Sequence, residues 1–93
     1  MTLHCVYSGS HATTAALTSQ LAEDDCILLL GEACVLALPG NPSLNGLNDW
    51  KVYALDEDLA ARGIEATDSR VQSINYEGWL DLTVKQANQR LWR

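Results

Sequence analysis

Residues 26–30 read Cys-Ile-Leu-Leu-Leu, the most apolar run in this sequence of 93 residues. A strand with one face in solvent alternates apolar and polar residues, but this run has no polar residue. We therefore expect a strand that is buried on both faces. Because a sheet with both faces covered needs helices on both sides, the run predicts an α/β fold with a parallel sheet.

The stretch Lys51–Gly63 predicts a strand followed directly by a helix, which is the junction that recurs in an open parallel sheet. Val52–Leu55 suits a buried strand, and Asp56 follows at once as the expected N-cap of a helix whose next two residues are also acidic. Gly63 can adopt the left-handed conformation that closes a helix. The joint offers three carboxylates and no nucleophile, so we expect the acids to cap the helix and compensate its dipole rather than to form an active site.

Four further segments complete the pattern of alternating strands and helices. We expect strands at Leu3–Tyr7 and Val71–Ile74, and helices at Ser10–Leu21 and Asn75–Gln86, the first of them capped by Ser10. The predicted architecture is a small open parallel sheet of about four strands with helices on both faces, in a single domain spanning residues 1–93.

Other segments are less determined by their sequence. Cys34–Leu38 suits either a brief helix or an additional strand, and Pro39–Asp49 is expected to be a long loop that either faces a partner or is simply variable. Ala22–Asp25 is expected to be a solvated acidic turn. The ending Lys85–Arg93 is interpreted as a mostly polar tail, whose Trp92 either folds back or inserts into a neighbouring subunit.

The overall composition excludes several classes of partner. A formal net charge of −6 disfavours direct binding to nucleic acid, which relies on clustered Lys and Arg. The sequence has neither a membrane-spanning apolar window nor the pattern of a signal peptide, so we expect a cytoplasmic protein. No metal-ligand cluster or cofactor motif is present. The turn Ser8–Ser10 resembles an anion-binding loop only faintly, because it lacks the further glycines and the lysine of such loops.

Three cysteines, Cys5, Cys26 and Cys34, form neither an even disulfide framework nor a Cys-x-x-Cys pair, which suits free buried thiols. Cys34 is the best candidate for a reactive sulfur. If residues 34–38 are helical, backbone amides and the dipole would lower its thiol pKa. The sequence favours a packed side chain instead, since Val35, Leu36 and Leu38 suggest a core position and free Cys behaves as a small hydrophobe. His4 neighbours Cys5, but adjacent residues of a strand point to opposite faces, so the two cannot form a catalytic pair.

Large aromatic residues are numerous for so small a core, and such residues often lie at subunit interfaces. In the last predicted helix, apolar residues recur along one broad stripe from position 76 to position 87. The candidates for contacts with other subunits are Tyr53, Tyr76, Trp79 and Trp92. We therefore expect association with other chains.

Five stretches of the sequence carry a resemblance to a known family. They are Leu28–Leu30, Val52–Gly63, Ile74–Tyr76, Leu82–Thr83 and Gln89–Trp92. Together they resemble the TusB/DsrH family of sulfur-relay proteins over nearly the whole chain. The second stretch is the most specific, because its residue types and spacing match over a dozen positions.

The resemblance implies a DsrE/DsrF-like fold and a cytoplasmic heterohexamer with TusC-like and TusD-like subunits. In the Tus pathway this complex receives persulfide sulfur from a TusA-like donor and passes it through TusE toward 2-thiolation of the wobble uridine of tRNA. The acceptor cysteine belongs to the TusD subunit, so a TusB-like chain is expected to be a non-catalytic subunit. Relatives of the DsrH type act instead in sulfur oxidation, and the sequence leaves that alternative open.

Two departures from the family pattern bear on sulfur handling by this chain itself. The first helix contains no cysteine between Ala12 and Ala22, where some DsrH-like relatives carry one. Glu32-Ala33 replaces an Asp-Gly pair, and Cys34 falls at an aliphatic position of the pattern. A persulfide carrier acting through Cys34 remains the enzymatic alternative. An acidic signalling receiver is disfavoured, because the first strand ends in Tyr7-Ser8 rather than in acids.

Overall fold

The computed structural model describes residues 1–93 and contains one five-stranded sheet in which all strands are parallel. Their order across the sheet is β4-β3-β2-β1-β5. The α/β class and the open parallel sheet are therefore confirmed, with one strand more than expected. The strands are β1 (Thr2–Val6), β2 (Cys26–Leu29), β3 (Lys51–Leu55), β4 (Val71–Ile74) and β5 (Asn88–Trp92).

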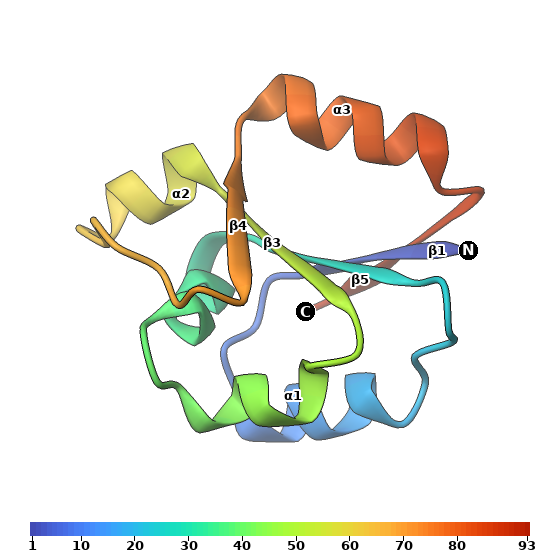
Figure 1. Cartoon of the computed structure of the whole chain (residues 1–93), viewed down its shortest axis with the longest axis horizontal. Helices are drawn as coiled ribbons and strands as arrows, with labels where there is room; N and C mark the ends of the chain where they lie inside the picture. The colour runs from blue at the N-terminus through green and yellow to red at the C-terminus, as the bar shows by residue number, and fades with distance from the viewer.

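The helices cover the two faces of the sheet unequally. Figure 1 shows α3 above the sheet, α1 below it and α2 at its left-hand edge. None of the helices combines the length and the apolar character needed to cross a membrane. The α-helices are α1 (His11–Thr18), α2 (Asp56–Ala61) and α3 (Tyr76–Lys85), and the three-ten helices are η1 (Gly31–Ala37) and η2 (Pro42–Leu47).

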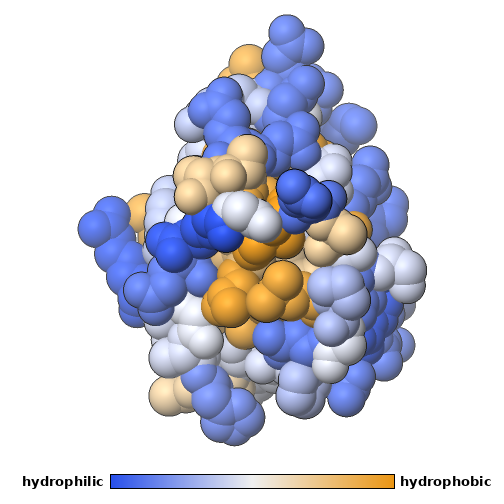
Figure 2. Space-filling view, turned by 90° about the vertical axis from the view of Figure 1, so that its left-hand side faces the viewer, coloured by the Kyte–Doolittle hydropathy of each residue, from blue (hydrophilic) through white to orange (hydrophobic).

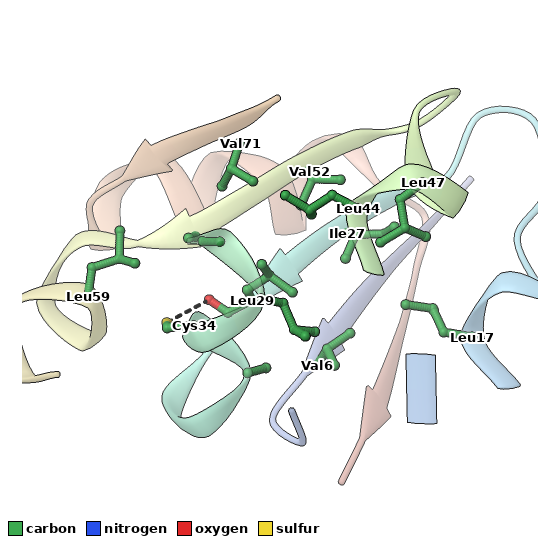
Figure 3. Close-up of a cluster of buried hydrophobic side chains, with 14 residues drawn as sticks. Val6, Leu17, Ile27, Leu29, Cys34, Leu44, Leu47, Val52, Leu59 and Val71 are labelled. Atoms are coloured by element: carbon green, nitrogen blue, oxygen red, sulfur yellow. Dashed lines mark hydrogen bonds between the residues drawn. The ribbon is translucent and has the colours of Figure 1, made fainter. Parts of the chain in front are cut away.

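The core is divided by the sheet into a large and a small cluster. The large cluster has 14 buried residues and joins the sheet to η1, η2, α1 and α2 (Figure 3). The small cluster has 6 buried residues and is covered by side chains that include Trp79 and Leu82 of α3. All four residues of β2 are buried, as its apolar run predicts, because both faces of this strand are covered.

Capping residues mark the helix boundaries. Ser10 accepts a hydrogen bond from the Thr13 N–H at the start of α1, as expected, and Asn75 does the same for the Gly78 N–H at α3. Gly63 has φ +70° and follows the end of α2, as predicted. The expected N-cap at Asp56 is wrong, because Leu55 occupies the cap position without a side-chain hydrogen bond.

The segment from Pro39 to Asp49 is more ordered than a loop. It contains η2, which Asn41 caps by accepting a hydrogen bond from the Ser43 N–H. Leu44 and Leu47 are buried in the large cluster. The segment therefore contributes to the core, a role that its many turn-forming residues conceal in the sequence.

The ending of the chain is not a tail. Residues 88–92 form β5, an edge strand that pairs with β1 from Thr2 to Val6. Trp92 folds back onto this chain, which confirms the first of the two alternatives for that side chain. The sequence does not reveal this strand, because most of its side chains are exposed and it lacks the apolar signal of a buried strand.

Candidate functional site

The three thiols are all free and buried. Burial raises the pKa of the Cys5 and Cys26 thiols above their ordinary value. Cys26 accepts a hydrogen bond from the side-chain amide of Gln86. A thiol in such surroundings is protonated at neutral pH and is a poor nucleophile.

Cys34 lies in η1, but its surroundings have the opposite effect to the one expected for a helical first turn. Its Sγ is 3.6 Å from the Leu29 carbonyl oxygen, to which the thiol donates, within the large cluster (Figure 3). Burial, together with the negative charge of Asp58, raises its pKa to about 11. The conditional expectation of a lowered pKa is therefore wrong, and the structure supports the packed side chain that the sequence favours. The condition for a reactive Cys34 is not met in this structure.

The acidic junction between β3 and α2 has a structural role. Asp58 accepts a hydrogen bond from the Gly31 N–H at 2.8 Å, which ties the start of η1 to the first turn of α2. Gly31 has φ +50°, in the left-handed region that favours glycine. The Asp58 carboxylate thus stabilises a junction between η1 and α2, a long-range contact that differs from the expected capping of α2.

A polar hollow of about 470 Å³ lies where β1 and β5 end, lined by Tyr7, Ser8, Glu32 and Arg93. The Ser8 hydroxyl accepts hydrogen bonds from the Ser10 N–H and the Thr13 hydroxyl. No lining residue is a thiol or a histidine.

Figure 2 views the side on which α2 and η1 lie and shows an apolar patch surrounded by polar side chains.

Helix α3 carries an exposed apolar stripe. Tyr76, Leu80 and Val84 follow one another at four-residue spacing and are 52%, 65% and 79% exposed. Trp79 and Leu82 instead pack against the small cluster. Of the predicted stripe, Trp79 packs inward whereas Tyr76, Leu80 and Val84 face outward. Leu82, which also packs inward, lies outside that predicted stripe. We call the exposed face, Tyr76, Leu80 and Val84, the α3 stripe.

The α3 stripe has an aromatic anchor and an acidic border. The rings of Tyr76 and Trp79 stack with centroids 6.0 Å apart. They line, with Leu80 and Thr83, a hollow of about 220 Å³. The charge of Glu57, with smaller effects of burial and of Asp58, raises the pKa of the Tyr76 hydroxyl. The surface offers apolar area next to negative charge, which suits contact with a protein.

A buried polar group that the sequence did not reveal joins the chain ends to the second strand. His4 Nε2 lies 2.8 Å from Asp25 Oδ2, and Trp92 Nε1 donates to His4 Nδ1 at 3.0 Å. Because an indole N–H can only donate, Nδ1 must accept, so His4 carries its proton on Nε2 and donates to Asp25. The Asp25 carboxylate also accepts from the Thr2 and Ala22 N–H groups.

The expectation of a solvated turn is therefore wrong for Asp25, which is buried. The sequence does not reveal the role of this aspartate, because its partner His4 lies 21 positions away. The contact follows only from the pairing of β1 with β2. Their register places Leu3 beside Cys26, and therefore brings Thr2 and His4 close to Asp25.

The four aromatic candidates for subunit contacts do not form one surface. Tyr53 and Trp79 are half-buried against the small cluster, Tyr76 is exposed on the α3 stripe, and Trp92 packs against the large cluster on the other side of the sheet. The structure thus brings together only Tyr76 and Trp79 in a ring contact.

The fold and these sites define a small parallel α/β protein with buried thiols and an exposed helical face. The family model described as "DsrH like protein" matches residues 8–89. The chain is 41% identical over 93 residues to Protein TusB of Salmonella newport, covering 96% of this chain and 94% of the relative. It is 40% identical over 94 residues to Protein TusB of Escherichia coli O81, covering 97% of this chain and 99% of the relative. The chain belongs to the TusB/DsrH family.

Proposed function

We propose that this chain is a non-catalytic subunit of a cytoplasmic sulfur-relay complex that serves 2-thiolation of the tRNA wobble uridine. In this proposal it assembles with TusC-like and TusD-like chains into a heterohexamer, and the relay proteins resembling TusA and TusE meet the complex through those companions. Membership of the TusB/DsrH family and the relatives named TusB support this role.

The observation that carries the non-catalytic role is the burial of all three thiols. Sulfur transfer between proteins requires a thiolate that can attack a persulfide and then release the sulfur to the next thiol. Cys34 is a fully buried member of the large cluster with a pKa of about 11, so little thiolate forms at neutral pH and access to the sulfur is blocked. The chain is better suited to hold companions than to carry sulfur.

Co-expression tests the assembly. We would produce this chain with the TusC-like and TusD-like chains of the same organism and measure the native mass of the purified complex. The proposal predicts equal numbers of the three chains in one particle, each present twice. A monomer that ignores both companions would overturn it.

The pathway needs a separate measurement, because DsrH-like relatives serve sulfur oxidation. Deleting the gene for this chain should abolish 2-thiouridine in the tRNA of the host, measured by mass spectrometry of digested tRNA. Full retention of 2-thiouridine together with a defect in sulfur oxidation would favour the alternative. Re-expression of a variant in which all three cysteines are replaced should restore the modification.

A further inference from the structure

The α3 stripe is not required by the core of this chain. Leu80 and Val84 are 65% and 79% exposed, whereas the inward face of the same helix, with Trp79 and Leu82, already packs against the sheet. Exposed apolar residues are common singly, but three at helical spacing with a stacked aromatic neighbour form a continuous face. Such a face is typical of a helix that packs on both sides.

The layer containing α3 is also too narrow for the sheet beneath it. Five strands about 4.8 Å apart span about 19 Å, whereas a helix with its side chains is about 10 to 12 Å wide. Leu91 of the edge strand pairs with Cys5, a member of the small cluster, so both side chains point to the α3 side. Leu91 is 53% exposed. Apolar surface on this side of the sheet is therefore left uncovered next to the helix layer.

Negative charge borders the α3 stripe. Glu77 and Asp81 each follow a stripe residue by one position, which places them about 100° further round the helix. Glu57 and Asp58 of α2 act on the Tyr76 hydroxyl, so their charge lies beside the first residue of the stripe. Lys85 is the only basic residue in α3. A surface that matches this border must carry Lys or Arg around an apolar centre.

We propose that the α3 stripe docks a companion subunit through an apolar patch rimmed by basic side chains, and not a second copy of this chain. This inference rests on the proposed function and names the surface it uses. A second copy is disfavoured because two-fold packing would bring the acidic borders together, in a chain whose net charge is −6. The aromatic pair at the start of the stripe supplies a rigid anchor of the kind that dominates binding energy.

The test uses the complex formed with the TusC-like and TusD-like chains. Leu80→Asp and Val84→Asp each place a charge on the stripe, where the exposed side chains contribute little to folding. We expect either variant to weaken assembly by about tenfold or more, measured by native mass at graded dilution. Ala16→Asp is the matched control, because it places the same charge on an exposed position of α1, and it should assemble as the wild type does.

Reversing the charge of the acidic border is a second experiment, which leaves the apolar side chains of the stripe unchanged. Glu77→Lys with Asp81→Lys should weaken assembly at low salt and lose this effect as salt is raised. Glu23→Lys with Asp24→Lys, two exposed acids in the turn before β2, should have no effect. Thermal unfolding followed by circular dichroism checks that each variant is folded.

The outcomes separate the surface from the function. Assembly of the wild type and of both stripe variants with equal affinity overturns the surface and leaves the proposed function intact. Failure of the wild type to assemble overturns both. A dimer of the isolated chain that Leu80→Asp disrupts also overturns the proposal, because a second copy would then be the occupant.

Discussion

Trp92 Nε1 donates a hydrogen bond to His4 Nδ1 at 3.0 Å, across 88 positions of the sequence. The bond fixes the edge strand β5 to β1 through a buried ring, whose other nitrogen lies 2.8 Å from Asp25. The guanidinium carbon of Arg90 lies 4.4 Å from the centroid of the Trp92 ring, in a cation–π contact. The last strand is thus held by specific polar contacts as well as by its backbone pairing.

Removing the indole donor should destabilise the fold. Trp92→Phe keeps an aromatic ring but leaves the buried His4 Nδ1 without a partner, which costs about 1 to 3 kcal/mol. Urea unfolding followed by fluorescence or circular dichroism measures the loss. Trp50→Phe is the control, because Trp50 Nε1 donates to the Ala22 carbonyl at an exposed site where water replaces the bond. Equal losses in the two variants would contradict the special role of Trp92.

The Asp25 carboxylate should contribute far more to the free energy of unfolding than the carboxylate of Asp24. Asp25→Asn replaces a charged acceptor of three hydrogen bonds by an amide with one acceptor oxygen, and we expect a loss of about 2 to 3 kcal/mol. Asp24→Asn changes an exposed side chain and should stay within about 0.5 kcal/mol of the wild type. The comparison uses the free energy of unfolding in urea. Similar values for the two variants would show that Asp25 is not held as described.

The same carboxylate predicts a pH dependence of stability. Burial alone would raise the pKa of Asp25, but hydrogen bonds from Ala22, His4 and Thr2 outweigh it and hold that pKa below its ordinary value of 3.8. A carboxyl with a lowered pKa in the folded state stabilises the fold above its ordinary pKa, and this stabilisation is lost as the pH falls through the lowered value.

Acid unfolding should therefore begin below about pH 4, and Asp25→Asn should flatten this part of the profile. The variant should keep some acid sensitivity, because Arg70 also holds the pKa of Asp68 well below its usual range. Free energies of unfolding at several pH values provide the measurement. A variant whose profile runs parallel to that of the wild type would contradict the assignment.

The three thiols should not react with alkylating reagents in the folded protein at neutral pH. Because Cys5, Cys26 and Cys34 are buried with raised pKa values, iodoacetamide should modify none of them at neutral pH, whereas all three should react in denaturant. Intact mass counts the modified sites. A variant with Cys5→Ala and Cys26→Ala isolates Cys34, whose rate should rise with pH toward a pKa of about 11. Rapid modification of Cys34 at neutral pH would restore the persulfide-carrier alternative.

Local signals in the sequence predicted much of the fold. The unbroken apolar run predicts the buried β2, Ser10 predicts the start of α1, and Gly63 predicts the end of α2. Each depends on neighbours within a few positions, so propensity and capping chemistry suffice. The family resemblance, which covers most of the chain, is confirmed by the match to residues 8–89.

Features that depend on distant partners were not predictable in the same way. Strand β5 is stabilised by pairing with β1, and Asp25 is buried because His4 and Thr2 reach it from another strand. Cys34 shows the same limit for chemistry. Its helical position alone favours a lowered thiol pKa, but burial and the negative charge of Asp58 raise that pKa instead. The α3 stripe was seen in the sequence, although its division into an inward and an outward face required the structure.

The most direct test of the account asks whether this chain itself ever carries sulfur. The assembled complex would be loaded by a persulfide donor, and the intact mass of each chain would be measured after rapid denaturation and blocking of thiols. The account predicts an added sulfur atom on a companion chain and an unchanged mass for this one. Stoichiometric sulfur on this chain, released when a downstream acceptor is added, would contradict the account.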